Sequence, residues 1–219
     1  MGGSGRLVDA LVGFLRARGT EFHLGTKIGG LILEDGRCVG VRAEDGRIFR
    51  GRKGVVSTIH VKHLVDMAPP DVWGETFRYG VKTYNVGVPF FASYLATTAP
   101  PVFQTPRGPR MAVSAGYAGW IEDLVQSGRN IYDGRFSDDI AWLLVATPSL
   151  VDPGRAPAGH HTVKLLTHTI YDLPGEGPAG WAARKEAYTD RLLATLRRFC
   201  PGFTDDVILA RLTKSPVDI

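Results

Sequence analysis

The stretch most similar to a known phosphate-binding motif is the glycine-rich segment Gly2-Gly3-Ser4-Gly5. A glycine-rich turn binds phosphate when a strand precedes it and a helix follows, because backbone N–H groups then point at the anion. The G-x-G-x-x-G spacing requires a glycine three residues after Gly5, but Val8 occupies that position. Only Met1 and Gly2 precede Gly3, so we expect no strand before the turn. The glycines are therefore interpreted as the tight start of a packed helix.

The other residues with chemically reactive side chains do not form a metal-binding or catalytic group. His160 and His161 are neighbours, so in a strand their side chains would face opposite sides and could not share a metal. Asp138-Asp139 is expected to be a solvated turn, because adjacency alone does not indicate paired-carboxylate chemistry. No G-x-S-x-G sequence is present for a nucleophilic serine. The sequence predicts no metal site and indicates no catalytic residue.

The composition is that of a folded protein. Of the 219 residues, 44% are apolar, which is enough for a sizeable core. The net charge is only +4 and the basic residues are scattered without aromatic interleaving, which argues against nucleic-acid binding. The densest basic group, residues 47–53, is interpreted as a solvated strand edge, with weak contact with acidic lipid headgroups as the alternative. Cys38 and Cys200 indicate no disulfide framework, so a cytoplasmic location is expected, with peripheral membrane contact as an alternative.

Residues 1–60 have the pattern of a helix followed by strands. Leu7, Leu11 and Phe14 recur at helical spacing and predict a helix over 5–18 with one buried face. Asp35-Gly36 and Asp45-Gly46 indicate two tight hairpin turns, because glycine adopts positive φ without steric cost. The expected strands are 21–24, 28–33, 38–43, 47–50 and 54–59. The last of these is a continuous apolar run, which predicts a strand buried on both faces, and Gly29-Gly30 indicates a bulge in the second.

Residues 61–219 have the pattern of a sheet with helices. Strands are expected within 81–96 and at 141–147, 161–170 and 207–212. Helices are expected at 63–67, 117–127 and 179–199, and the last carries an apolar stripe that includes Trp181, Tyr188 and Leu192. The predicted fold class is mixed α/β, with one domain over 1–60 and a second domain of mixed β-sheet flanked by helices over 61–219.

Several stretches, taken in order, resemble one group of flavoproteins. The glycine-rich helix start, the meander and the final strand Val55-Val56-Ser57-Thr58 are similar to the middle of flavin amine oxidase superfamily proteins. The second half contains stretches typical of phytoene desaturase-like and carotenoid ketolase-like members. These stretches are Pro148–Pro153, Ala156–Val163, Phe199–Phe203 and Ser215–Asp218. The resemblance covers nearly the whole chain.

The resemblance implies that residues 1–60 form part of a Rossmann-like FAD-binding domain with a β-meander. The residues implied as FAD contacts are Gly2, Gly3, Ile28, Ser57 and Thr58, although simple strand-terminal hydroxyls explain the last two equally well. The N-terminal dinucleotide-binding motif and the C-terminal flavin-binding segment of the family are not found in the sequence. We therefore expect an interior fragment that binds FAD weakly alone, with a partner segment that carries the missing motif.

The resemblance also implies an activity. Members of this kind are FAD-dependent oxidoreductases that transfer hydride from a substrate to the flavin, here an apolar isoprenoid or carotenoid. The residues predicted to contact the substrate are Tyr84, Phe91, Tyr94 and His161, although an ordinary buried sheet face explains the aromatic ones equally well. Two alternatives stay open. One is a non-catalytic module that binds an apolar ligand or a partner. The other is an amine oxidase-type flavoenzyme, which would need a lysine near the flavin, and Lys164 is the candidate.

Overall fold

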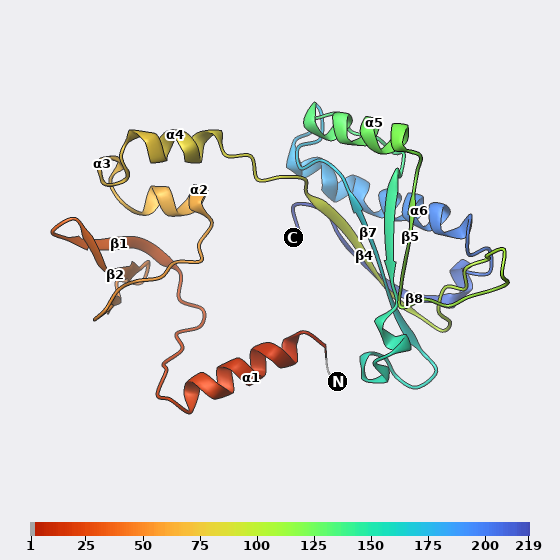
Figure 1. The fold of residues 1–219 in the computed structure, drawn as a ribbon, viewed down its shortest axis with the longest axis horizontal. Helices are drawn as coiled ribbons and strands as arrows, with labels where there is room; N and C mark the ends of the chain where they lie inside the picture. Colours follow the sequence, from red (N-terminus) through yellow and green to blue (C-terminus); the bar gives the residue numbers. More distant parts are fainter. Residues whose placement is uncertain (1–2) are drawn as a thin grey trace. The chain divides into compact units, whose positions relative to one another are not determined.

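The computed structural model describes residues 3–219, which divide into two compact units. One unit combines residues 3–11 with 87–219, and the other comprises residues 12–86. Helices and antiparallel strands alternate in both, so the predicted mixed α/β class is confirmed (Figure 1). The domain boundary at residue 60 stays a prediction, and the compact unit that contains the meander continues to Val86.

The first helix, α1 (Gly5–Arg16), forms where the apolar spacing predicts it. Its apolar stripe was expected to be buried, and that expectation is wrong. Leu7, Leu11 and Phe14 are 66%, 53% and 54% exposed, and no residue of the helix is buried. A helix buries its stripe only where another element packs against it, so helical spacing alone does not establish burial.

The meander is confirmed. It consists of β1 (Ile28–Glu34), β2 (Arg37–Ala43) and β3 (Ile48–Arg50), paired antiparallel in that order. The first turn places Asp35 and Gly36 at positive φ, as an Asp-Gly hairpin requires. The register shifts between Ile28 and Gly30, so the bulge predicted at Gly29-Gly30 is also confirmed.

The strands predicted at 21–24 and 54–59 are wrong. Both segments are irregular, and Val56, expected to be buried on both faces, is 94% exposed. A strand requires a neighbour that takes up its backbone hydrogen bonds. None of the strands in residues 3–219 pairs with either segment.

Short helices fill the rest of the smaller unit. They are α2 (Val61–Leu64), the 3-10 turn η1 (Val65–Met67), α3 (Pro70–Trp73) and α4 (Glu75–Thr83). The first two account for the helix predicted near 63–67. The strand predicted from residue 81 is wrong over 81–89, because α4 continues to Thr83. Phe77 and Val81 are four residues apart on that helix, and Val81 is buried.

The larger unit contains a five-stranded antiparallel sheet in the order β5-β6-β7-β4-β8. The strands are β4 (Phe90–Thr97), β5 (Ser114–Ala118), β6 (Trp142–Ala146), β7 (His161–His168) and β8 (Ile208–Lys214). The helices are α5 (Ile121–Tyr132) and α6 (Trp181–Arg197), with single turns η2 (Pro148–Leu150), η3 (Pro153–Arg155), η4 (Pro178–Gly180) and η5 (Asp205–Val207). The sequence missed β5, whose residues it assigned partly to a helix.

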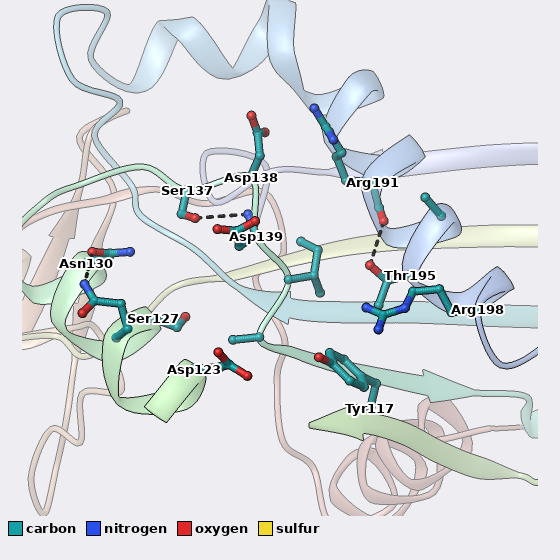
Figure 2. Close-up of a pocket in the computed structure, with 14 residues that line it drawn as sticks. Tyr117, Asp123, Ser127, Asn130, Ser137, Asp138, Asp139, Arg191, Thr195 and Arg198 are labelled. Atoms are coloured by element: carbon teal, nitrogen blue, oxygen red, sulfur yellow. Dashed lines mark hydrogen bonds between the residues drawn. The ribbon is translucent and has the colours of Figure 1, made fainter. Parts of the chain in front are cut away.

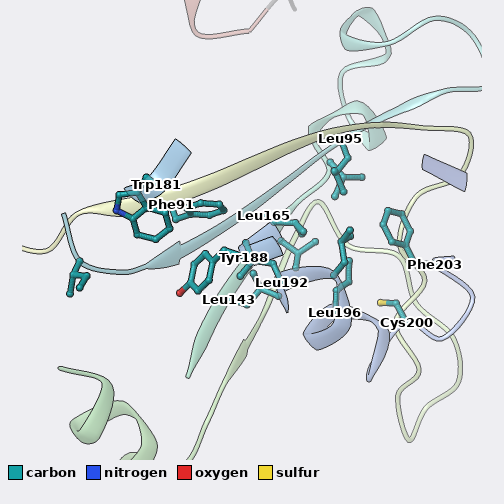
Figure 3. Close-up of a cluster of buried hydrophobic side chains, with 14 of the residues drawn as sticks. Phe91, Leu95, Leu143, Leu165, Trp181, Tyr188, Leu192, Leu196, Cys200 and Phe203 are labelled. Carbon is teal, nitrogen blue, oxygen red and sulfur yellow. The ribbon is translucent and has the colours of Figure 1, made fainter. Parts of the chain in front are cut away.

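The core lies between α6 and one face of this sheet (Figure 3). Alternate residues of β4, including Phe91 and Leu95, face α6, as do alternate residues of the neighbouring strands. From the helix, Trp181, Tyr188 and Leu192 pack against them, and the ring centroids of Phe91 and Tyr188 are 4.8 Å apart. The predicted stripe of the long helix is therefore confirmed. None of the helices in residues 3–219 is long and apolar enough to cross a membrane.

Candidate functional site

The face of the five-stranded sheet opposite α6 remains exposed in the larger unit, and we name it the open sheet face. Successive side chains of a strand point to opposite faces, so the residues between the core residues point here. Tyr94 of β4 lies in register with Lys164 of β7 and with Leu212 of β8. Tyr94 and Leu212 are 43% and 58% exposed. This sheet is therefore packed on one face only.

A hollow of about 870 Å³ lies over this face, and we name it the apolar hollow. Small side chains produce the depression, because Ala96 and Ala146 lie beside the larger Tyr94 and Leu212. The loop that contains η2 and η3 contributes to the rim. The residues whose side chains share the face and line the hollow are Tyr94, Ala96, Ala146, Thr162, Lys164 and Leu212. Its size lies within the range of pockets for small molecules.

An aromatic group occupies the other end of the open sheet face. The ring of His168 stacks on Trp142 with 4.6 Å between the ring centroids, and Phe90 lies 4.9 Å from the same imidazole. Burial lowers the pKa of His168 from its ordinary value. Burial therefore favours the neutral form of this imidazole.

The charged residues that line the apolar hollow are cations. Arg155 lies 3.3 Å from the carboxylate of Asp152, which is itself buried. Lys164 directs its ammonium over the ring of Tyr94, 5.3 Å from the ring centroid.

The remaining cation, Arg211, is on β8 and is engaged from α6. Its guanidinium lies 2.9 Å from Glu186 and 2.5 Å from Asp190, which also raise its pKa. Of the three cations, Lys164 is therefore the one that has no carboxylate partner among the described residues.

The structure does not bring together the four residues predicted to contact a substrate. Tyr94 lines the apolar hollow, but Phe91 is fully buried against α6, so the ordinary sheet core explains it. His161 lies on the same face as Phe91, where its Nδ1 is 3.2 Å from the hydroxyl of Ser149. Tyr84 follows α4 in the other unit, 5.9 Å from the ring of His60. A substrate contact for these three residues stays a prediction without support from their positions.

The sequence did not identify Ala96, Ala146 or Leu212 as site residues. They come from three strands, and only the pairing register shows that they share one face. The alternation in β7 was a usable signal, because Thr162 and Lys164 alternate with buried Val163 and Leu165.

The residues predicted to contact FAD lie in different settings. Gly2 lies outside the described residues. Gly3 has φ +76, and a Cβ built there would lie 3.0 Å from the guanidinium of Arg155. Ile28 is half-buried at the first position of β1. Ser57 and Thr58 are exposed in an irregular segment, where the Ser57 hydroxyl accepts a hydrogen bond from the N–H of Ile59.

These residues do not by themselves fit FAD. The segment that contains Ser57 and Thr58, expected to be a strand that approaches the flavin, is not a strand. The individual flavin contacts stay predictions, and no chemical step through the flavin is assigned to them.

A second, polar cavity of about 430 Å³ lies between α5, residues 137–141 and α6 (Figure 2). Asp139 and Asp138 lie on one side, and Arg191 and Arg198 lie on the helix side. Arg198 places its guanidinium 5.6 Å from the ring centroid of Tyr117. Residues 3–219 contain no group of three side chains arranged to hold a metal ion. The polar lining makes this cavity a poorer fit to an apolar ligand than the apolar hollow.

Comparison with known proteins agrees with the fold and with the sequence resemblance. Over 94% of its length the chain superposes on a crystal structure of an oxidoreductase from Methanosarcina mazei, with a TM-score of 0.57 and 16% identity, covering 40% of that chain. The fold is thus similar to that of part of this longer chain.

In sequence, the chain is 26% identical to a neurosporene-forming phytoene desaturase of Cereibacter sphaeroides, over 94% of this chain and 39% of the relative. It is also 26% identical to pyridine nucleotide-disulfide oxidoreductase domain-containing protein 2 of Mus musculus, over 100% of this chain and 39% of that protein. Other carotenoid desaturases and prolycopene isomerases match most of the chain as well.

The resemblance to phytoene desaturase-like proteins is therefore confirmed, and the chain spans about two-fifths of the length of these two relatives. No protein-family model matches the chain.

Proposed function

We propose that this chain supplies the substrate-binding sheet of a FAD-dependent oxidoreductase that acts on an apolar, isoprenoid or carotenoid-like substrate. The observation that carries the proposal is the apolar hollow on the open sheet face. The similarity to carotenoid desaturases over most of the chain supports the same class of activity. In such enzymes the flavin supplies the redox chemistry, and the protein supplies an apolar, water-poor binding surface.

The dimensions of the open sheet face suit an elongated ligand. From Phe90 to Ala96 the strand advances six residues, which corresponds to roughly 20 Å. Along this distance the face carries aromatic rings at one end and the apolar hollow at the other. Because α6 packs against the opposite face, the sheet beneath the ligand is supported by the core.

A second function has an observation in its favour. The segment expected to approach the flavin, residues 54–59, is not a strand, and a non-catalytic module that binds an apolar ligand would need no flavin. Flavin retention by the protein isolated from its native source separates the two. FAD that stays with the protein supports the oxidoreductase, whereas ligand binding by a flavin-free protein supports the module.

Ligand binding at the hollow can be tested with a polyene methyl ester that fluoresces when it leaves water. Wild-type protein should enhance the fluorescence in a saturable way. Ala96→Trp places a large ring in the hollow from an exposed position and should weaken binding about tenfold or more, whereas Ala183→Trp, at an exposed alanine of α6 away from the open sheet face, serves as the matched control. Equal binding by both variants would contradict the proposed site.

A further inference from the structure

We propose that the ligand of the apolar hollow carries a carboxylate or a similar anionic oxygen at one end, and that Lys164 recognises this group. The inference rests on the proposed function in one respect, namely that the hollow is the ligand site. It goes further by assigning a substrate class, an apolar chain with an acidic end, and a residue that selects it.

The position of Lys164 carries the argument. It lies on β7, the middle strand of the sheet, in register with Tyr94 of β4 and with Ala146 of β6, and it lines the hollow. Its side chain is half-buried, and its ammonium faces the Tyr94 ring at 5.3 Å from the ring centroid. A ligand that fills the hollow must therefore cover this ammonium.

The surrounding charges leave Lys164 available. Arg155 at the rim is engaged by Asp152, and Arg211 is engaged by Glu186 and Asp190 on the α6 side. Among the residues that line the hollow there is no carboxylate. Of the residues that line the hollow, Lys164 therefore presents the one ammonium without an anionic partner among the described residues.

A pure hydrocarbon would bind here at a disadvantage. It would displace water from the ammonium and provide no acceptor, and an unpaired buried charge is strongly unfavourable. The Tyr94 ring offsets only part of this cost. A carboxylate would form a charge-assisted hydrogen bond with the same ammonium.

The two ends of the open sheet face also fix an orientation. The aromatic group of Trp142, Phe90 and His168 lies four residues along β7 from Lys164, a distance of roughly 13 Å. The apolar tail of the ligand therefore extends from Lys164 toward these rings.

The test compares two probes with the same polyene chain, the anionic parinaric acid and its uncharged methyl ester, by fluorescence titration of the full chain. Wild-type protein should bind the acid about tenfold more tightly than the ester, and added salt should reduce the difference. Lys164→Met should remove the preference while binding of the ester is retained, which also shows that the variant is folded. Lys214→Met is the matched control, because Lys214 is on the same sheet face but does not line the hollow.

The outcomes separate this inference from the proposed function. Equal affinity of wild-type protein for acid and ester, or an acid preference that survives Lys164→Met, would overturn the role of Lys164 and leave the apolar site standing. Failure of both probes to bind would overturn the apolar site and the inference together. Loss of the preference in Lys214→Met as well as in Lys164→Met would also overturn the assignment to Lys164.

Discussion

Two buried groups in the sheet–helix core illustrate what burial does to single residues. Burial raises the pKa of Tyr188 to about 12 and the pKa of the Cys200 thiol to about 11. Both groups are neutral when protonated, so the apolar surroundings favour the protonated form. Tyr188 packs edge-on against Phe91, and Cys200 follows the end of α6.

These shifts predict a loss of stability in alkaline solution. In the unfolded chain the two groups would release protons near their ordinary values of 9 to 10, whereas in the folded chain they hold them to about 11 to 12. Their contribution is therefore fully present below pH 9 and is lost as the pH rises toward 12, at up to about 1.4 kcal/mol per pH unit for each group.

Urea unfolding at a series of pH values measures this effect. Tyr188→Phe should make the fall in the free energy of unfolding above pH 10 less steep. Tyr132→Phe, which changes a tyrosine that is 73% exposed, should leave the fall as it is in the wild type. The same slope in Tyr188→Phe and wild type would refute the assignment to Tyr188.

At the scale of elements, the sequence predicted those parts of the fold whose signal is local. The meander, its bulge at Gly29-Gly30 and the stripe of α6 were read from turn residues and periodicity. The segments 21–24 and 54–59 were misread, because an apolar run becomes a strand only beside a partner, and pairing is not a local property. Of the four residues predicted to contact the substrate, only Tyr94 lines the site, and Lys164 was named for another function, since pairing across β4, β6, β7 and β8 decides which residues share the open sheet face.

Glycine packing in the meander gives an element-scale prediction. A Cβ at Gly40 of β2 would lie 2.5 Å from the carbonyl oxygen of Phe49, so Gly40→Ala should destabilise the smaller unit by about 1–3 kcal/mol. Gly13→Ala is the control, because it lies in α1 with open space around it and should stabilise by about 0.5–1 kcal/mol. Thermal unfolding followed by circular dichroism gives both values, and a harmless Gly40→Ala would contradict the observed strand spacing.

Leucine-to-alanine substitutions on the two sides of the large sheet should lower the free energy of unfolding by different amounts. Leu192 of α6 is fully buried, so Leu192→Ala should lower the free energy of unfolding by about 2–5 kcal/mol. Leu212 on the open sheet face is 58% exposed, and Leu212→Ala should cost less than about 1 kcal/mol. Chemical denaturation measures both, and similar costs would mean that the open sheet face is packed in solution.

At the scale of the whole molecule, the larger unit alone carries the proposed binding site. Its sheet has one face closed by α6 and one face that carries the apolar hollow, an aromatic end and Lys164. The chain is similar to proteins more than twice its length. Substrate binding is therefore the role proposed for this chain, and none of the redox chemistry follows from its described residues.

The most direct test of that assignment is methyl NMR of alanine- and leucine-labelled protein, titrated with the polyene ester. If the ligand binds in the apolar hollow, the resonances of Ala96, Ala146 and Leu212 should shift together and saturably, while those of Leu192 and Leu196 in the core stay in place. Shifts confined to the exposed leucines of α1, or to Ala194 beside the polar cavity, would show that the ligand binds elsewhere and would contradict the proposed site.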